Sequence, residues 1–200
     1  MNILITWTNS GIWKALKECL WVNHRIFKVS KNQSNEDNFF QCDLTKNENI
    51  EKLDFFDTIF DVIIFNAGVW YYSWFFEQSL ENYEEIINLN LLSPIRLLKK
   101  LEHNIDKKTK IIFMWSIASK KFMKNGSVYL ASKFGLRWFA WWLKEEWKKV
   151  YIINPKIVET DFHKWKIDLP ENINVKSPLE IVKLVEDIIS WKETRFEIDL

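Results

Sequence analysis

The chain has 200 residues and a formal net charge of +1, from 28 Lys and Arg against 27 Asp and Glu. This length suits a single well-buried core, so we expect residues 1–200 to form one domain. The near-neutral balance of charge gives no general reason to expect nucleic acid or an anionic membrane as a partner.

The sequence also favours a cytoplasmic location. Its N-terminus lacks a basic region followed by a long apolar core, and no apolar run reaches the roughly 18 residues that a membrane span needs. Cys19 and Cys42 form neither a metal-type spacing nor a disulfide framework, which fits a reducing compartment. We therefore expect a cytoplasmic protein without a metal site.

Strand candidates alternate with helix candidates along the chain. We expect strands at 2–6, 25–30, 39–44, 60–65, 110–114, 150–154 and 195–200, and helices at 14–20, 50–56, 80–101, 128–148 and 178–190. Pro94 predicts a kink or a local irregularity inside the 80–101 helix, and Ser177 predicts an N-cap followed by proline at the first helical position. The alternation predicts an α/β protein of the Rossmann type, with a doubly wound, mostly parallel sheet and helices on both faces.

Tyr129 and Lys133 are the first candidates for chemistry. They lie four residues apart at the start of a predicted helix, which places them on one helix face. A nearby ammonium favours the phenolate and lowers the pKa of a tyrosine, so Tyr129 is a candidate general acid/base. Ser116 ends an apolar strand candidate and is placed to hydrogen-bond a substrate oxygen. The alternative for the pair alone is an exposed helix face that carries Tyr and Lys without function.

The segment after the first strand candidate has the pattern of a phosphate-binding turn. A strand, a tight loop at 7–13 and a helix follow one another, which is the opening of a dinucleotide-binding fold. Free backbone N–H groups and the helix dipole at such a turn attract a pyrophosphate. Ser10, Gly11 and Ile12 would line it.

In order and spacing, these residues resemble the motifs of the classical short-chain dehydrogenase/reductase family over nearly the whole chain. Three of the family's motifs concern the cofactor: its TGxxxGxG loop matches residues 6–13, its acid after the third strand matches Asp43-Leu44, and its NNAG motif matches 65–68 with Phe65 in the first place. Its catalytic residues match Asn90 on a helix, Ser116, and the YxxxK pair Tyr129 and Lys133. Its Pro-Gly and later threonine match Pro155-Lys156 and Thr160. Lys156 departs from the pattern.

The resemblance implies an oxidoreductase that interconverts a small carbonyl substrate and its alcohol by hydride transfer with NAD(P)(H). Tyr129 would protonate the carbonyl oxygen, Lys133 would lower the pKa of Tyr129 and hold the nicotinamide ribose, Ser116 would orient the oxygen, and Asn90 would support a proton relay through water. The residues assigned to the cofactor are Thr6, Trp7, Asn9, Ser10, Gly11, Ile12, Trp13, Ser30, Lys31, Asp43, Leu44, Asn66, Ala67, Gly68, Tyr129, Lys133, Pro155 and Thr160.

The choice between the two nicotinamide cofactors depends on the end of the second strand candidate. An acid there selects NAD, whereas a basic group accommodates the 2′-phosphate of NADP. Ser30-Lys31 occupies this place, and no acid follows until Glu36. NADP is therefore favoured, with NAD as the alternative. Taken singly, Asp43 and Thr160 are also typical of cap or turn residues.

Two expectations concern assembly and activity. Relatives commonly form homodimers or homotetramers through helices that match 80–101 and 128–148. A catalytically inactive cofactor-binding or scaffold protein on the same fold is the alternative function, because a fold does not fix an activity. The complete set of Asn, Ser, Tyr and Lys argues against that alternative.

The tryptophan content is abnormal. The chain has 12 Trp and 4 Gly, whereas average usage predicts about 14 glycines, close to the two counts together. Trp7, Trp13, Trp115 and Trp138 fall where the family has glycine, and Trp191 falls where glycine would end a helix. We hypothesise that UGA encodes glycine in the source, as in some uncultured bacterial lineages; the alternative is a genuinely Trp-rich member. The other seven tryptophans are not assigned individually, because some could pack as large apolar side chains. Indoles at 7 and 13 would project into the space of the pyrophosphate, so the chain as printed is expected to be impaired.

Overall fold

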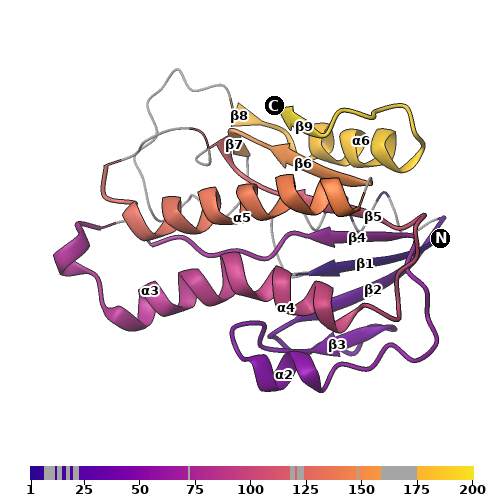
Figure 1. The fold of residues 1–200 in the computed structure, drawn as a ribbon, viewed down its shortest axis with the longest axis horizontal. Helices are drawn as coiled ribbons and strands as arrows, with labels where there is room; N and C mark the ends of the chain where they lie inside the picture. Colours follow the sequence, from indigo (N-terminus) through magenta and orange to yellow (C-terminus); the bar gives the residue numbers. More distant parts are fainter. Residues whose placement is uncertain are drawn as a thin grey trace.

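The computed structural model describes residues 1–6, 12, 15–16, 19, 23–71, 73–117, 120, 124–147, 149–158 and 175–200. Its centre is a parallel sheet of seven strands in the order β3-β2-β1-β4-β5-β6-β9 (Figure 1). The strands are β1 (Asn2–Thr6), β2 (Arg25–Ser30), β3 (Phe39–Gln41), β4 (Val62–Phe65), β5 (Lys110–Met114), β6 (Val150–Asn154) and β9 (Glu197–Asp199).

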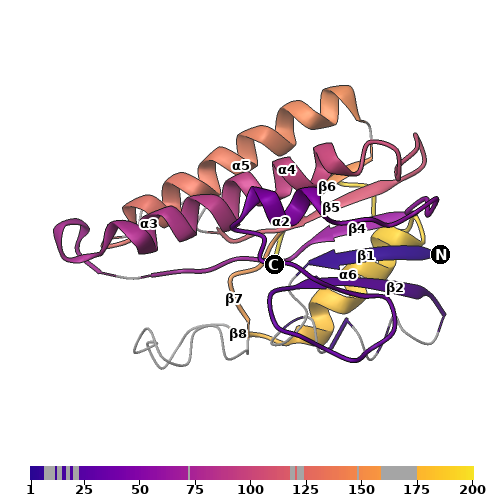
Figure 2. The same ribbon diagram turned by 90° about the horizontal axis from the view of Figure 1, so that it is seen from below.

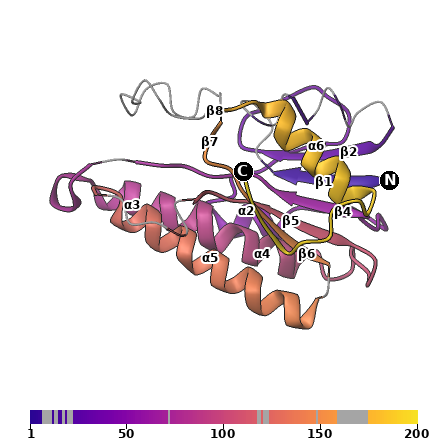
Figure 3. The ribbon, with the colours of Figure 1, turned by 90° about the horizontal axis from the view of Figure 1, so that it is seen from above.

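Helices cover both faces of this sheet, as Figures 2 and 3 show. One face carries α2 (Asn47–Glu51), α3 (Leu80–Ile87), α4 (Ser93–Lys100) and α5 (Ser127–Glu146), and the other carries α6 (Pro178–Ile189). Two apolar clusters fill the spaces between the sheet and these helices. Parallel strands buried on both faces need continuous apolar runs, and the central strands have them. The predicted Rossmann-type α/β fold is confirmed.

The order of the strands reverses between β1 and β4. β1 pairs with β2 on one side and with β4 on the other, both in parallel register. In open α/β sheets, ligands bind beyond the carboxyl ends of the strands at such a switch point. The ends of β1 and β4, at Thr6 and Phe65, are therefore the expected edge of a binding site.

The predicted 80–101 helix is interrupted rather than simply kinked. α3 ends at Ile87, a π-helical turn η2 spans Asn88–Leu92, and α4 begins at Ser93. Pro94 has no N–H to donate to the carbonyl four residues earlier, which is that of Asn90, so the regular α-helical hydrogen-bond series cannot continue there. The irregularity that Pro94 predicted lies just before it and places Asn90 in the wide turn.

The predicted helix at 50–56 is wrong. α2 spans Asn47–Glu51, and the chain then extends so that Leu53 and Phe55 are buried while Asp54 and Phe56 are exposed. Asp54 Oδ1 accepts the N–H of Phe56 at 2.7 Å, in a local turn that competes with helix. Two apolar side chains that point into the core on alternate residues favour an extended chain over a helix.

The remaining differences concern short elements. The strands expected at 39–44, 60–65 and 195–200 are shorter than predicted, at Phe39–Gln41, Val62–Phe65 and Glu197–Asp199. A two-stranded sheet of β7 (Ile157–Val158) and β8 (Val175–Lys176) was not predicted. The 3-10 turn η1 (Phe75–Glu77) precedes α3. The predicted N-cap is confirmed, because Ser177 forms a capping box with Glu180 at the start of α6.

Candidate active site

The carboxyl ends of β1 and β4 are joined by one buried hydroxyl. Thr6 Oγ1 accepts the backbone N–H groups of Asn66 and Ala67, each at 3.1 Å. These two residues begin the loop that leaves β4 at the switch point of the sheet. Thr6 therefore fixes the path of the Asn66–Gly68 turn, which the sequence assigned to the cofactor.

Gly68 lies against two of the predicted catalytic residues. A Cβ at this position would lie 3.3 Å from Asn90 Oδ1 and 3.6 Å from Lys133 Nζ. The first distance is tighter than ordinary van der Waals contact, so a side chain at this position would require Asn90 Oδ1 to shift by a few tenths of an ångström. The loop from β4, the π-helical turn and α5 thus meet at Gly68.

The side chain of Asn90 is buried and fully hydrogen-bonded within this meeting point. Its Oδ1 accepts the N–H of Val69 at 2.8 Å, and its Nδ2 donates to the carbonyl of Val69 at 2.9 Å. Nδ2 also donates to Ser132 Oγ at 3.2 Å. Both amide hydrogens and the carbonyl oxygen of the Asn90 side chain thus have protein partners. The side-chain amide of Asn90 is therefore not free to bind the water of the predicted proton relay.

Tyr129 and Lys133 lie in the first two turns of α5 and face the same buried space. Lys133 Nζ lies 5.4 Å from the centroid of the Tyr129 ring, and both side chains are 6% exposed. The side chains of Ser116 and Tyr129 hydrogen-bond to each other. Ser116 follows the end of β5, so the structure brings together three of the four predicted catalytic residues with Asn90 alongside.

The predicted electrostatic effect on Tyr129 is corrected by the structure. Burial raises the pKa of Tyr129 to about 12, although its hydrogen bond with Ser116 acts to lower it. Burial also lowers the pKa of Lys133 to about 8. Removal of water disfavours both charged forms, and this effect outweighs the attraction that the four-residue spacing suggested.

The residues at the end of β2 form an ion pair of their own. Lys31 Nζ lies 3.2 Å from Asp43 Oδ2, and Thr45 donates two hydrogen bonds to Asp43 Oδ1. Burial opposes the ionisation of Asp43, but the hydrogen bonds from Thr45 and Lys31 outweigh it and lower the pKa of that carboxyl. Ser30 and Leu44 are buried beside this pair.

Glu36, the nearest acid after Ser30, forms an ion pair with a lysine of β2. Its Oε2 lies 2.9 Å from Nζ of Lys28, a side chain that is 1% exposed on β2. The carboxylate thus neutralises a buried lysine of the same strand. On the far side of the sheet, the carbonyl of Pro155 accepts the N–H of Ile117 at 3.2 Å, which ties the segment after Ser116 to the end of β6.

Several predicted cofactor residues lie outside the described residues: Trp7, Asn9, Ser10, Gly11, Trp13 and Thr160. Ile12 is described and is helical and half-buried. The predicted phosphate-binding turn as a whole therefore stays a prediction.

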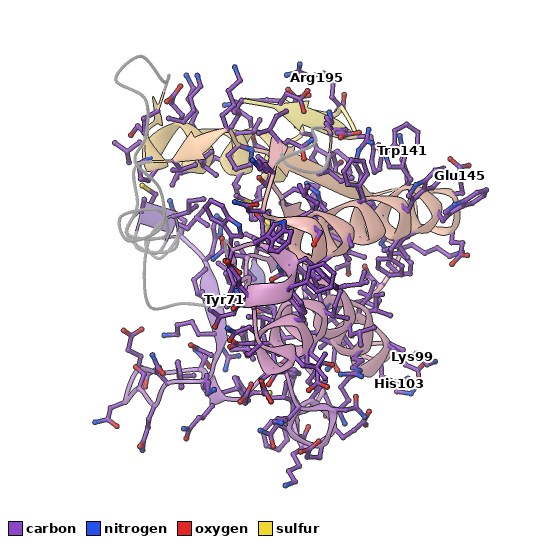
Figure 4. The ribbon with its side chains drawn as sticks, turned by 90° about the vertical axis from the view of Figure 1, so that its left-hand side faces the viewer. Tyr71, Lys99, His103, Trp141, Glu145 and Arg195 are labelled. Carbon is purple, nitrogen blue, oxygen red and sulfur yellow. The ribbon has the colours of Figure 1, made fainter. Side chains whose placement is uncertain are left out.

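Ser132 and Tyr71 are two residues near the site that the sequence reasoning did not single out. Ser132 is fully buried one position before Lys133, and its Oγ donates to the carbonyl of Tyr129 at 2.7 Å. Its signal was a serine inside an otherwise apolar helix face. The hydroxyl of Tyr71 donates a hydrogen bond to Glu85 of α3. Figure 4 labels Tyr71 next to the helices of that face. That hydrogen bond, together with burial, raises the pKa of Tyr71 to about 12.

Among the described residues, no group of three or more His, Cys, Asp or Glu side chains is placed to hold a metal ion. No helix in the described part of the chain has the length and apolar character to cross a membrane.

Comparison with known proteins identifies the class. The family model for short chain dehydrogenases matches residues 20–168. The chain therefore belongs to the short-chain dehydrogenase family, and it is an NAD(P)-dependent oxidoreductase of that family.

Individual relatives agree with this assignment. The chain is 24% identical over 173 residues to the 3-oxoacyl-(acyl-carrier-protein) reductase MabA of Mycobacterium avium, covering 80% of this chain and 68% of that protein. It superposes on a short chain dehydrogenase family protein of Francisella tularensis with a TM-score of 0.87 and 27% identity, covering 100% of this chain and 96% of that one. An alcohol dehydrogenase of Thermococcus sibiricus complexed with 5-hydroxy-NADP shares the fold, with a TM-score of 0.81, 22% identity, and coverage of 100% and 95%.

The described residues fit a nicotinamide cofactor. Gly68 brings the loop from β4 close to the buried Lys133 Nζ, from which an added Cβ would lie 3.6 Å away. This meeting point adjoins the switch point of the sheet, where such cofactors bind in α/β folds.

Proposed function

We propose that the protein reduces a small ketone or aldehyde with NADPH, or oxidises the corresponding alcohol, with Asn90, Ser116, Tyr129 and Lys133 as its active-site residues. The observation that carries this proposal is the hydrogen bond between Ser116 and Tyr129 beside the buried Lys133. Two hydroxyl groups on one carbonyl oxygen and an ammonium nearby form a site that holds and protonates that oxygen.

The raised pKa of Tyr129 suits the direction of reduction. At neutral pH the phenol holds its proton, because burial raises its pKa to about 12. It can therefore donate that proton to the carbonyl oxygen, while Ser116 orients the same oxygen by a hydrogen bond. The bound nicotinamide supplies the hydride that completes the alcohol. Lys133, whose pKa is about 8, provides a positive charge near the developing oxyanion at neutral pH.

Support for NADP comes from Ser30 and Lys31 at the end of β2. Lys31 is exposed and its Nζ pairs with Asp43, so the ammonium is held at this end of the sheet, where a 2′-phosphate would bind. The Thermococcus sibiricus relative is complexed with an NADP derivative. NAD remains the alternative, and the remaining cofactor residues named above keep their proposed roles.

We also propose that the source reads UGA as glycine, and that Trp7, Trp13, Trp115, Trp138 and Trp191 are glycines in the native protein. Trp191 supports this because it follows Ser190, the C-cap of α6, and adopts φ +64, a conformation that favours glycine. Trp115 supports it because its buried indole Nε1 has no hydrogen-bond partner in the part of the chain that the structure describes. We call the sequence as printed the tryptophan form, and the chain with glycine at all twelve positions the glycine form.

The wider setting of the proposal follows the family. A single domain over residues 1–200 would carry both the cofactor site and the catalytic residues. The substrate would be a small carbonyl or alcohol, with neither nucleic acid nor membrane as a partner. Assembly into a homodimer or homotetramer would use α3, α4 and α5, and the protein would act in the cytoplasm.

A titration of both forms with NADPH tests the proposal, together with NADPH consumption over a panel of small carbonyls. We expect the glycine form to bind and consume NADPH, the tryptophan form to bind weakly, and Tyr129→Phe in the glycine form to bind NADPH without turnover. Equal tight binding by both forms would refute the expected weak binding of the tryptophan form, and UGG codons at these positions of the gene would refute the glycine assignment. Binding without consumption of NADPH on any carbonyl would favour the inactive cofactor-binding protein.

A further inference from the structure

Ser132 links the helix that carries Tyr129 and Lys133 to the loop that leaves β4. Its Oγ donates to the backbone carbonyl of Tyr129 at 2.7 Å and accepts from Asn90 Nδ2 at 3.2 Å. Ser132 is 0% exposed and Asn90 is 1% exposed. The two residues are 42 positions apart in sequence, so this contact depends on the packing of α5 against η2.

The hydrogen-bond inventory fixes the orientation of the Asn90 amide. A serine hydroxyl has one hydrogen to donate, and in Ser132 that hydrogen goes to the carbonyl of Tyr129. Its oxygen therefore meets Asn90 as an acceptor only, which requires the NH₂ group of Asn90 on that side. A flipped amide would set its oxygen against Ser132 Oγ and the carbonyl of Val69, both acceptors.

The oriented amide in turn holds the loop from β4. Asn90 closes two hydrogen bonds with the backbone of Val69, at 2.8 and 2.9 Å. Val69 follows Gly68, whose Cα faces both Asn90 Oδ1 and Lys133 Nζ. The position of the loop relative to Lys133 thus depends on a chain of contacts that begins at the Ser132 hydroxyl.

We propose that Ser132 is a positioning residue for the reaction: its hydroxyl orients the Asn90 amide and thereby holds the Val69 and Gly68 backbone against the end of α5 that bears Tyr129 and Lys133. This inference rests on the proposed carbonyl reduction. Ser132 does not touch the reacting atoms, and it acts through Asn90.

The test compares Ser132→Thr with Ser132→Val in the glycine form. Threonine and valine have nearly the same shape, so any overpacking in this buried place is common to both, and only the hydroxyl differs. We expect Ser132→Thr to retain kcat within about threefold and Ser132→Val to lose about tenfold, the usual effect of one lost hydrogen bond that leaves a buried amide donor unpaired. KM for the carbonyl should change little.

A double-mutant cycle shows whether Ser132 acts through Asn90. Because the two residues share one contact, Ser132→Ala combined with Asn90→Ala should lose no more kcat than Asn90→Ala alone. Ser93→Ala is the matched control, since Ser93 is also buried in a helix and donates only to the carbonyl of Leu89, at 2.7 Å. This control should leave kcat unchanged. Additive losses in the cycle, or equal kcat for Thr and Val, would overturn the inference.

Hydrogen exchange at the amide of Val69 separates this inference from the proposed function. That N–H donates to Asn90 Oδ1, so it should exchange faster in Ser132→Val than in Ser132→Thr. A glycine form that turns over no carbonyl would refute the proposed reaction. The exchange rates of the Val69 amide would then still test whether Ser132 orients Asn90 and so holds the Val69 backbone. Equal rates in the two variants would overturn it.

Discussion

Lys133 Nζ lies 5.2 Å from the ring centroid of Trp115, the residue directly before Ser116. Trp115 is 5% exposed and belongs to the apolar cluster between the sheet and the helices, beside the buried Lys133. Its Nε1 is buried without a hydrogen-bond partner among the described residues, and such an orphaned donor costs about 1–3 kcal/mol. The cation over the ring recovers part of this cost, but the indole occupies room next to the ammonium that would hold a cofactor ribose.

We therefore expect Trp115 to block the cofactor. A chain with glycine at the other eleven tryptophan positions that keeps Trp115 should bind NADPH at least about tenfold more weakly than the glycine form. The matched control keeps Trp141 instead, which projects outward from α5 (Figure 4) and is 47% exposed. This control should bind NADPH as the glycine form does. Isothermal titration measures both, and equal affinity for the two chains would contradict the prediction.

The backbone at the end of α6 favours glycine at position 191. The N–H of Lys192 donates to the carbonyl of Asp187 at 2.8 Å, and the N–H of Trp191 donates to the carbonyl of Ile188 at 3.3 Å. These two hydrogen bonds form a Schellman motif. Trp191 has φ +64 in it. A residue with a Cβ costs about 1 kcal/mol in this left-handed conformation.

Trp191→Gly should therefore be more stable than Trp191→Ala by about 1 kcal/mol. Comparing these two variants with each other removes the contact of the indole with Lys110 Nζ, which lies 3.8 Å from its ring and is lost in both. Urea unfolding measures the difference. An alanine variant as stable as the glycine variant would show that the left-handed conformation is not the constraint.

Gly68 gives a prediction about close approach. Gly68→Ala in the glycine form would bring a Cβ to 3.3 Å from Asn90 Oδ1 and 3.6 Å from Lys133 Nζ, so one of these groups must move. We expect kcat/KM for carbonyl reduction to fall about tenfold, a loss typical of misplaced active-site groups. Gly126→Ala is the control, because among the described residues its Cβ would meet only Leu130 Cγ, at 3.9 Å. Unchanged kcat/KM in Gly68→Ala would contradict this close packing.

The sequence predicted the secondary structure correctly where a whole segment is buried. The prediction was wrong at 50–56, where buried and exposed residues alternate over a short segment. Largely apolar runs at 60–65, 110–114 and 150–154 predicted strands of a parallel sheet. Leu53 and Phe55 misled the helix prediction because two apolar residues in a short segment fit either period. β7 and β8, with two residues each, carry no periodic signal at all.

The sequence predicted those features of the candidate site that depend on local spacing, and it did not predict those that depend on contacts between distant segments. The four-residue separation predicted that Tyr129 and Lys133 share a helix face, and they do. The link from Ser132 to Asn90 joins residues 42 positions apart, so no local pattern reveals it. The direction of the pKa shift of Tyr129 was also missed, since it comes from burial, which spacing along a helix does not report.

Glu197 gives a prediction on stability in acid. Arg137 Nε and Asn154 Nδ2 donate to its Oε1 at 2.9 and 2.8 Å, and Lys120 Nζ lies 2.8 Å away. Burial opposes its ionisation, but these donors outweigh burial and lower its pKa to about 2. A carboxyl with a lowered folded-state pKa stabilises the fold above its unfolded pKa of about 4.3, and this contribution disappears as the pH falls toward 2.

Glu197→Gln should therefore lower the free energy of unfolding at pH 7 by about 2 kcal/mol, with a smaller difference at pH 3 than at pH 7. Glu84→Gln is the control, because Glu84 is exposed on α3, and we expect it to change the free energy of unfolding little at either pH. Chemical unfolding at pH 7, 5 and 3 measures these differences. A loss in Glu197→Gln that is equal at all three pH values would contradict an electrostatic role.

The pH dependence of carbonyl reduction follows from Lys133. Its pKa is lowered by burial to about 8, whereas that of Tyr129 is raised to about 12. Between pH 6 and 7.5 both groups are protonated, so kcat/KM for reduction should be level there. Above about pH 8 Lys133 loses its charge and the rate should fall, while Tyr129 still holds its proton. Lys133→Arg keeps its charge, so the residual activity of that variant should lack this fall. NADPH consumption from pH 6 to 10 measures both profiles, and a parent profile that stays level to pH 10 would rule out the titration of Lys133 as its cause.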